Sequence, residues 1–396
     1  MKPGYKQTDV GVIPEEWEIL QIRDVCRLVN GRGFKPHEWQ TSGLPIIRIQ
    51  NLNGSDDFNF YSGQYHPKIL IEHGQLLFAW SGSRGTSFGP HVWNGGRALL
   101  NYHTWKVVVN ESNVTPDFLL YALRQLTSYI ENMAHGASAL VHTQKWQMEK
   151  LPIVVPASHP EQHAIATALS DMDALLASLD RLIAKKRDLK QAAMQQLLTG
   201  QTRLPGFHDE WEVKLLPEVC QFRGGKAHEQ HITEFGQFVC VNSKFISSDG
   251  NVRKYSTANF CRARRDDILM VMSDLPNGRA LAKAYLVEQD DLYAVNQRVC
   301  ALTAYRDSPQ FLYYILNRNP YFLKFDDGVS QTHLLNNVFM NCPITISPTV
   351  SEQTAIAGGL GDMDAELVAL EQRRDKTRAL KQAMMQELLT GRTRLL

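Results

Sequence analysis

One short motif in the sequence has the residue spacing of a catalytic nucleophile. Residues 85–89 read GTSFG and match the G-x-S-x-G pattern of a nucleophile elbow. That elbow requires a strand before the serine and a helix after it. Pro90, Gly95 and Gly96 follow the motif, and proline and glycine disfavour a helix. We therefore expect residues 85–89 to form a loop without catalytic function.

Other catalytic and metal-binding patterns are missing from the sequence. No Pro-Pro dipeptide occurs, which excludes the Asn/Asp-Pro-Pro-Tyr motif of amino-methyltransferases, and Ala227 follows Gly225-Lys226 where a Walker A loop needs Ser or Thr. The Pro-Asp pair at 116–117 lacks the following Glu/Asp-x-Lys of a nuclease. There is no H-E-x-x-H, and the six cysteines form no C-x-x-C pair. The sequence predicts a non-catalytic chain with no metal site and no cofactor of its own.

Polar side chains suited to DNA recognition are frequent in the loop-rich parts of the sequence. Arg and Lys bind guanine or phosphate, Asn and Gln bind adenine, and Ser and Thr bind several partners. The net charge is only +1, so DNA binding would need charge grouped by the fold or supplied by a partner. The candidate DNA-binding residues are Arg32, Lys35, Arg48, Asn51, Asn53, Ser83, Arg84, Thr86, Lys145, Arg223, Lys226, Asn242, Lys244, Asn277, Arg279, Arg298 and His333.

The elements that must position these residues are organised as a tandem repeat. Residues 161–204 and 352–395 share 27 identities in 44 positions at a constant offset of 191. A shorter match, EEWEILQIRDVC at 15–26 against DEWEVKLLPEVC at 209–220, opens each copy. The segments between these anchors, 27–157 and 221–348, share little. We infer two similar frames that carry two dissimilar inserts.

The repeated segment is predicted to be a long helix in both copies. Its apolar residues alternate at spacings of four and three, which is the pattern of a coiled-coil seam. Both segments open with a capping-box pattern that ends at Glu161 or Glu352, and they close at Gly200 and Gly391. The seam residues are Ile165, Leu169, Met172, Leu176, Leu179, Ile356, Leu360, Met363, Leu367 and Leu370.

Charge patterning predicts how the two helices pair. Acidic residues lie in the first half of each helix and basic residues in the second half, for example Asp173 and Lys190 in one copy and Asp364 and Lys381 in the other. An antiparallel pair places the acidic half of one helix beside the basic half of the other. We therefore expect an antiparallel coiled coil with a two-fold relation between the copies.

The inserts are predicted to be mixed α/β. Short strands are expected at 43–52, 74–80 and 103–109 and a helix at 116–126, and the second copy offers the same order at 237–243, 266–272, 298–305 and 309–318. The predicted architecture is thus two pseudo-two-fold-related α/β domains joined by two long antiparallel helices. The expected boundaries are 1–157, 158–204, 205–348 and 349–396.

Composition predicts the cellular compartment. The sequence contains no run of about 18 apolar residues, which is the length needed to span a bilayer, and its first residues lack the apolar stretch of a secretory signal. Scattered cysteines without pairing patterns are typical of reduced thiols. We expect a cytoplasmic protein without a membrane partner.

The anchor motifs resemble those of one known family. The carrying features are GVIPEEWE at 11–18, the LPIVVP…EQHAI passage at 151–165 with its echo CPITISP…EQTAI at 342–356, and the LKQAxMQxLLTGxTRL ends of both helices. Together they are similar to the specificity subunit of type I restriction-modification systems over essentially the whole chain. Two departures are the PGFHDEW entrance of the second copy and Cys342 at the position of Leu151.

The resemblance implies two target-recognition domains, each reading one half of a split double-stranded DNA sequence, and a coiled-coil spacer between them. It also implies two methyltransferase subunits that dock on the spacer and restriction subunits that cut DNA in defence against phage. S-adenosylmethionine, ATP and Mg²⁺ would be bound by these partners and not by this chain. Two alternatives stay open: the recognition part of a bifunctional restriction-methylation enzyme, and a coiled-coil scaffold that does not bind DNA.

Overall fold

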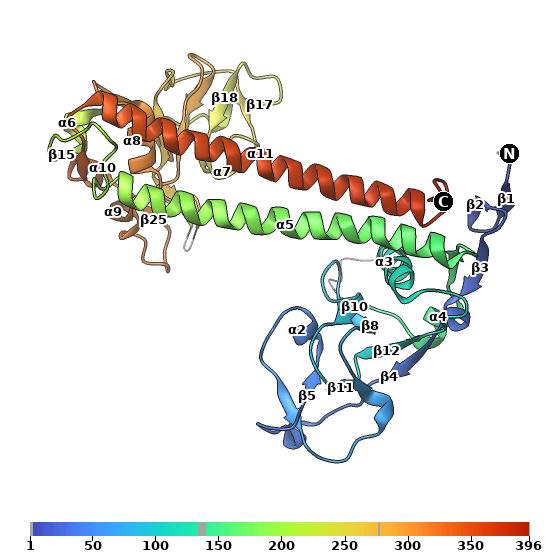
Figure 1. Ribbon diagram of the computed structural model, residues 1–396. Helices are drawn as coiled ribbons and strands as arrows, with labels where there is room; N and C mark the ends of the chain where they lie inside the picture. Colours follow the sequence, from blue (N-terminus) through green and yellow to red (C-terminus); the bar gives the residue numbers. More distant parts are fainter. Residues whose placement is uncertain (1–2, 134–139, 276–277, 396) are drawn as a thin grey trace. The chain divides into compact units, whose positions relative to one another are not determined.

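A computed structural model describes residues 3–133, 140–275 and 278–395 (Figure 1). The chain folds into two compact units: unit 1 comprises Met1–Asp180 and Gln372–Leu396, and unit 2 comprises Arg181–Glu371. Each unit holds one insert and one half of each long helix. The finer division into recognition domains and separate spacer helices stays a prediction.

Unit 1 is built from short strands and short helices around one longer helix, α3. Its strands are β1 (Tyr5–Thr8), β2 (Gly11–Pro14), β3 (Glu18–Gln21), β4 (Cys26–Asn30), β5 (Leu44–Ile47), β6 (Asn59–Tyr61), β7 (Leu70–Ile71), β8 (Gln75–Ala79), β9 (Ser81–Ser83), β10 (Gly89–Trp93), β11 (Ala98–Leu100), β12 (Thr104–Val109), β13 (Leu140–His142) and β14 (Pro152–Val155). Its helices are α1 (Ile22–Val25), η1 (Pro36–Glu38), α2 (Ile49–Leu52), η2 (Pro67–Ile69), α3 (Pro116–Met133), α4 (Lys145–Lys150) and the first half of α5 (His159–Leu197).

Two four-stranded sheets form the body of unit 1. One is antiparallel in the order β10-β8-β12-β4, and the other runs β6-β5-β11-β7 with a parallel β5–β11 pair. The main core joins Phe118 and Leu123 of α3 to Phe78 of β8 and Trp105 of β12, and Leu388 near the end of α11 (Val350–Leu388) is buried in the same cluster. The last turn of α11 is therefore part of the unit 1 core.

Unit 2 repeats this plan with different side chains. Its strands are β15 (Glu212–Leu215), β16 (Cys220–Gly224), β17 (Ile232–Thr233), β18 (Phe238–Val241), β19 (Tyr255–Ser256), β20 (Ile268–Val271), β21 (Ser273–Asp274), β22 (Ala284–Leu286), β23 (Tyr293–Val295), β24 (Val299–Ala304), β25 (Thr332–His333) and β26 (Pro343–Ile346). Its helices are α6 (Leu216–Val219), η3 (Glu229–His231), α7 (Ser243–Ser247), α8 (Pro309–Leu316), α9 (Pro320–Leu323), α10 (Asn336–Met340) and the first half of α11.

One sheet of unit 2 has the same strand order as its counterpart in unit 1, and the other shares its parallel pair but differs at its edge, where β17 pairs with β19 whereas β7 pairs with β11. The order β16-β24-β20-β22 matches β4-β12-β8-β10, and the parallel pair β18–β23 matches β5–β11. In both units a strand of the frame also pairs with the strand just before a long helix, β3 with β14 and β15 with β26. The mixed α/β prediction is confirmed for both inserts.

One expected strand is only half correct. The segment 43–52 forms β5 and then turns into α2, because Asn51 caps the turn: its Oδ1 accepts from the Arg48 N–H at 3.0 Å and its Nδ2 donates to the Asp57 carbonyl at 2.9 Å. The other expected strands and helices lie where the sequence pattern placed them, within two residues at most ends, although α3 runs on to Met133. Within the described residues, no helix is long and apolar enough to cross a membrane.

Candidate nucleic-acid interface

In unit 1, a buried carboxylate joins three parts of the frame. Glu161 lies in the first turn of α5 and is 3% exposed. Its carboxylate accepts from Trp17 Nε1 at 3.2 Å and from Arg394 Nε and Nη2 at 2.9 and 2.8 Å. The tryptophan opens the first copy of the repeat, whereas the arginine ends the second copy. The frame of unit 1 therefore includes the C-terminal end of the other copy.

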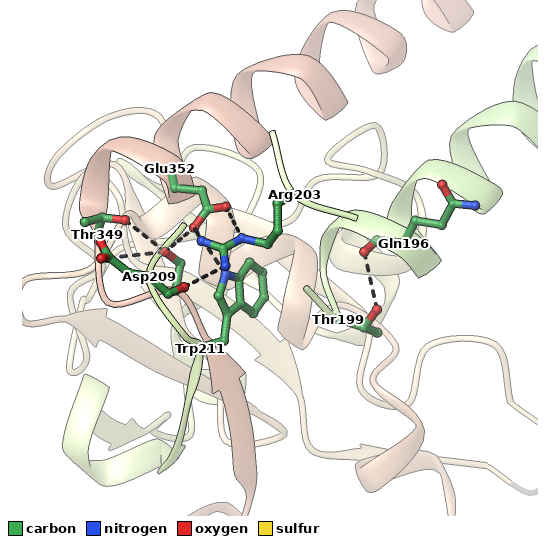
Figure 2. Close-up of polar contacts among 8 residues, drawn as sticks. Gln196, Thr199, Arg203, Asp209, Trp211, Thr349 and Glu352 are labelled. Atoms are coloured by element: carbon green, nitrogen blue, oxygen red, sulfur yellow. Dashed lines mark hydrogen bonds and ion pairs between the residues drawn. The ribbon is translucent and has the colours of Figure 1, made fainter. Parts of the chain in front are cut away.

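Unit 2 contains the same arrangement, drawn in Figure 2. Glu352 accepts from Arg203 Nε and Nη2 at 2.7 and 2.8 Å, from Trp211 Nε1 at 3.1 Å and from Ser347 Oγ at 2.5 Å. Burial alone would raise the pKa of Glu352, but these donors outweigh burial and lower it. Glu161 and Glu352 thus anchor each frame, a role beyond the capping box that the sequence suggested.

The glutamine that follows each anchor fixes the insert to the helix. Gln162 accepts from the Thr115 N–H at 2.7 Å and donates to the Asn113 and Pro156 carbonyls at 3.1 and 2.8 Å. Gln353 accepts from the Ser308 N–H at 2.7 Å in the same way. Both glutamines are 0% exposed. These contacts explain why a Glu-Gln pair opens both long helices.

A third repeated contact ties each insert helix to both long helices. In unit 1 the Tyr121 hydroxyl donates to Asp173 at 2.9 Å, and Lys381 of α11 pairs with the same carboxylate. In unit 2 the Tyr314 hydroxyl donates to Asp364 at 2.8 Å, and Lys190 of α5 pairs with it. Burial would raise the pKa of Asp173, but Lys381 and Arg124 lower it.

The two long helices pair in opposite directions within each unit. In unit 2, Lys186 lies 2.7 Å from Glu366 and Arg187 pairs with Glu371; in unit 1, Arg374 lies 3.9 Å from Asp180. Acidic first halves therefore face basic second halves, as the charge pattern predicted. All ten predicted seam residues are buried or half-buried.

The end of α11 lies beside the N-terminal segment of unit 1. The Tyr5 hydroxyl donates to the Gly391 carbonyl at 3.1 Å. Gly391 has φ +71°, and a Cβ there would lie 2.4 Å from Pro14 Cδ. The end of the second copy of the repeat therefore packs against Pro14 in unit 1.

Several candidate DNA-binding residues are engaged in contacts inside their own unit. Arg32 pairs with Glu38 and lies over the ring of Phe34 at 4.7 Å, and Arg223 pairs with Asp267, whose side chain is 0% exposed. Three others also shape the local fold. Arg48 lies over Trp39 at 5.0 Å, Asn51 caps α2, and Asn242 Oδ1 accepts from the Phe245 N–H at 2.9 Å.

The remaining candidates within the described residues lie in more accessible positions. Asn277 lies outside the described residues. Lys145 begins α4 and is half-buried beside Glu149 at 3.5 Å. The exposed candidates are Lys35, Asn53, Ser83, Arg84, Thr86, Lys226, Lys244, Arg279, Arg298 and His333.

Two hollows contain residues that sequence reasoning missed. The first, of about 430 Å³, lies in unit 1 and is lined by Asn30, Trp80, Tyr102, Trp105 and Gln144, together with Lys145. The second, of about 520 Å³, lies in unit 2 and is lined by Arg223 and Lys226 together with Phe260, Arg262 and Arg264. Aromatic residues at the ends of predicted strands were the available signal for the first, and the CRARR run at 261–265 was the signal for the second.

The GTSFG motif at residues 85–89 leads into strand β10. Ser87 is 2% exposed and is followed by strand β10 rather than a helix, so residues 85–89 do not form a nucleophile elbow. Within the described ranges, no group of three or more His, Cys, Asp or Glu residues could hold a metal ion.

Each of the two α/β units thus combines a repeated frame, a divergent insert and one half of each long helix. The sequence model of the type I restriction modification DNA specificity domain matches residues 14–185 and 208–378. The chain therefore belongs to this family of DNA-specificity subunits, which are non-catalytic.

Individual relatives agree with this family. The chain is 23% identical to the type I restriction enzyme MjaVIII specificity subunit of Methanocaldococcus jannaschii, over 97% of this chain and 94% of that one. It is 25% identical to the EcoBI specificity subunit of Escherichia coli over 48% of this chain and 40% of that one. The crystal structure of the type I restriction-modification S subunit from M. genitalium matches 98% of this chain and 99% of that chain, with a TM-score of 0.60 and 17% identity. A structure from a study of complex assembly in a type I restriction-modification system matches 96% of this chain and 99% of that chain, with a TM-score of 0.60 and 16% identity.

Proposed function

We propose that the chain reads a two-part DNA sequence, one part with each insert, and directs methyltransferase and restriction subunits to it. The observation that supports this most is the repeated frame. The Glu-Gln anchors, the Trp and Arg partners and the order of one four-stranded sheet recur in both units, whereas the inserts share little sequence. A duplicated frame with divergent inserts fits a protein that recognises two different DNA half-sites.

The proposed partners are two methyltransferase subunits on the paired helices and restriction subunits bound in turn. S-adenosylmethionine, ATP and Mg²⁺ would act on those partners, because this chain offers no motif for them. We also place the complex in a prokaryotic cytoplasm, where its DNA lies.

Charge supports a role for the partners in holding DNA. Residues 1–157 contain 14 Lys and Arg against 13 Asp and Glu, and residues 205–348 contain 15 against 16. Phosphate contacts need grouped cations and give a steep salt dependence. We therefore expect the chain alone to bind duplex DNA weakly with a shallow salt slope, and the complex with methyltransferase to bind tightly with a steep one. Equal affinity and slope in a salt titration of the two would contradict this.

The decisive experiment is to determine the methylated sequence. The chain is expressed with its methyltransferase subunit in a host without other adenine methylation, and the genome is read by single-molecule sequencing. A single split motif with a fixed gap is expected. Absence of a split motif would refute the proposal, and failure to co-purify with the methyltransferase would favour a scaffold. Methylation by the chain alone would favour the bifunctional enzyme.

A further inference from the structure

One region at the strand ends makes the same backbone hydrogen bonds in both units. In unit 1 the Trp80 N–H donates to the His103 carbonyl at 3.2 Å, and the Trp80 carbonyl accepts from the Thr143 N–H at 2.9 Å. In unit 2 the Met272 N–H donates to the Arg298 carbonyl at 2.9 Å, and its carbonyl accepts from the Leu334 N–H at 2.7 Å. These bonds make Trp80 and Met272 equivalent positions, each following the central strand β8 or β20.

A glycine closes the same region in both units. Gly31 follows β4, and its N–H donates to the Thr104 carbonyl at 3.3 Å; Gly225 follows β16, and its N–H donates to the Val299 carbonyl at 2.9 Å. A Cβ at either glycine would lie 2.0 Å from the carbonyl oxygen of an asparagine, Asn101 in unit 1 or Asn296 in unit 2. The chain segments meet so closely that a Cβ would clash with the neighbouring backbone, so this edge requires glycine in both units.

Most of the side chains on this edge differ between the units. In unit 1 Trp80 stacks on Trp105 with ring centres 6.1 Å apart, and Tyr102, 46% exposed, Gln144 and Lys145 complete the hollow. The hydrogen-bond equivalences assign the matching positions of unit 2, and besides the glycine and asparagine pairs described above the pair His142 and His333 keeps its residue type. The matching residues are Met272, Cys300, Gln297, Leu335 and Asn336, next to Arg298.

We propose that this edge is the base-reading surface of each unit, an inference that rests on the proposed function. Tyr102, Gln144 and Lys145 would contact base edges of one half-site, and Gln297, Arg298 and Asn336 would contact those of the other.

The chemistry of these side chains fits the major groove. Lysine and arginine bind guanine acceptors, glutamine and asparagine bind adenine, and an exposed ring packs on a thymine methyl. A side chain that discriminates between bases must also be held in a fixed position. Here Gln144 is the N-cap of α4 and Lys145 begins that helix, Asn336 begins α10, and Arg298 directly precedes β24, so a regular element holds each of them. Matching backbone hydrogen bonds with different side chains are the expected result when duplicated domains acquire different targets.

The test uses the full chain with its methyltransferase subunit and compares methylated motifs. Lys145→Ala and Gln144→Ala alter unit 1, and Arg298→Ala and Asn336→Ala alter unit 2. Lys68→Ala and Arg306→Ala are matched controls, because both are exposed cations away from this edge. Each edge variant should lose on the order of tenfold discrimination at one or two positions of a single half-site. The other half-site, the gap and both controls should keep the wild-type letters.

Two results would overturn the inference: unchanged letters in all four edge variants with methylation retained, or changes in both half-sites from a variant in one unit. Where a variant abolishes methylation, its complex selects duplexes from a random-sequence library. Enrichment of duplexes with a relaxed half-site then supports the inference. Enrichment of the wild-type sequence opposes it. Failure to enrich any sequence also opposes it when the variant complex unfolds at the same temperature as the wild-type complex. If the wild-type complex itself shows no split motif, the proposed function fails; if it does and the variants leave it intact, only this inference fails.

Discussion

Replacing Gln162 or Gln353 by alanine should destabilise one unit and spare the other. Each glutamine is buried and makes three hydrogen bonds, and two of the three partners of Gln353 are backbone groups, Ser308 N–H and the Ser347 carbonyl. A net hydrogen bond contributes about 1 kcal/mol, and each buried partner left unsatisfied costs about 1–3 kcal/mol. We therefore expect each variant to lose roughly 3–5 kcal/mol of the free energy of unfolding of its own unit.

The effect can be measured and assigned to a unit. For a unit of about 200 residues, that loss lowers the melting temperature by roughly 10 °C. Hydrogen exchange assigns it: Gln162→Ala should expose the Thr115 amide and leave the Ser308 amide protected, and Gln353→Ala should do the reverse. Gln191→Ala and Gln382→Ala, at exposed positions of the same helices, are the controls and should change stability by less than about 0.5 kcal/mol. A protected Thr115 amide in Gln162→Ala, or unfolding within about 1 kcal/mol of wild type, would refute the reasoning.

Three further predictions follow from the helices and the anchors. Gly359→Ala should raise stability by about 0.5–1 kcal/mol in urea unfolding, because Gly359 is exposed inside α11, a Cβ there meets nothing within 4 Å, and the first copy has Ala168; a loss of stability would show that the glycine is needed. Because the pKa of Glu352 is lowered on folding, its contribution to unit 2 is complete above the unfolded pKa of about 4.3 and is lost as pH falls through the folded pKa. Urea unfolding between pH 7 and 3 should thus depend less on pH in Glu352→Gln than in wild type, and equal slopes would count against the anchor. Inserting four residues after Lys186 adds about 6 Å of helix and should lengthen the gap of the methylated motif by roughly one or two base pairs with the half-site letters unchanged, whereas altered letters with the same gap would show that the helices do not set the spacing.

The sequence predicted the frame better than the recognition surface. The helices were evident because seam, charge gradient and end signals occur twice, and the sheet strands because their apolar runs are short and bounded. The contacts of Arg32 and Arg223 were not evident. Both are cations in polar loops by sequence, yet they pair with Glu38, six residues away, and Asp267, 44 residues away, and no local pattern reveals a partner at such separations.

The equivalence of Trp80 and Met272 was hidden for a different reason. It rests on backbone hydrogen bonds, which any side chain can accompany, so two inserts can keep one backbone edge without keeping one residue type. Sequence comparison detects retained side chains, whereas this edge retains only its geometry.

The shared frame has a consequence for the order in which the chain is made. Unit 2 lies within one continuous stretch, 181–371, whereas unit 1 needs residues 372–396 to supply Arg394, Lys381 and Leu388. A ribosome adds about 5–20 residues per second, so the opening residues wait on the order of ten seconds or more for the partners that complete their core. During that interval Glu161 is a carboxylate without its guanidinium, and the unit translated second is the first that can close. A stalled ribosome or a late stop codon would therefore prevent unit 1 from completing its core and leave unit 2 able to fold.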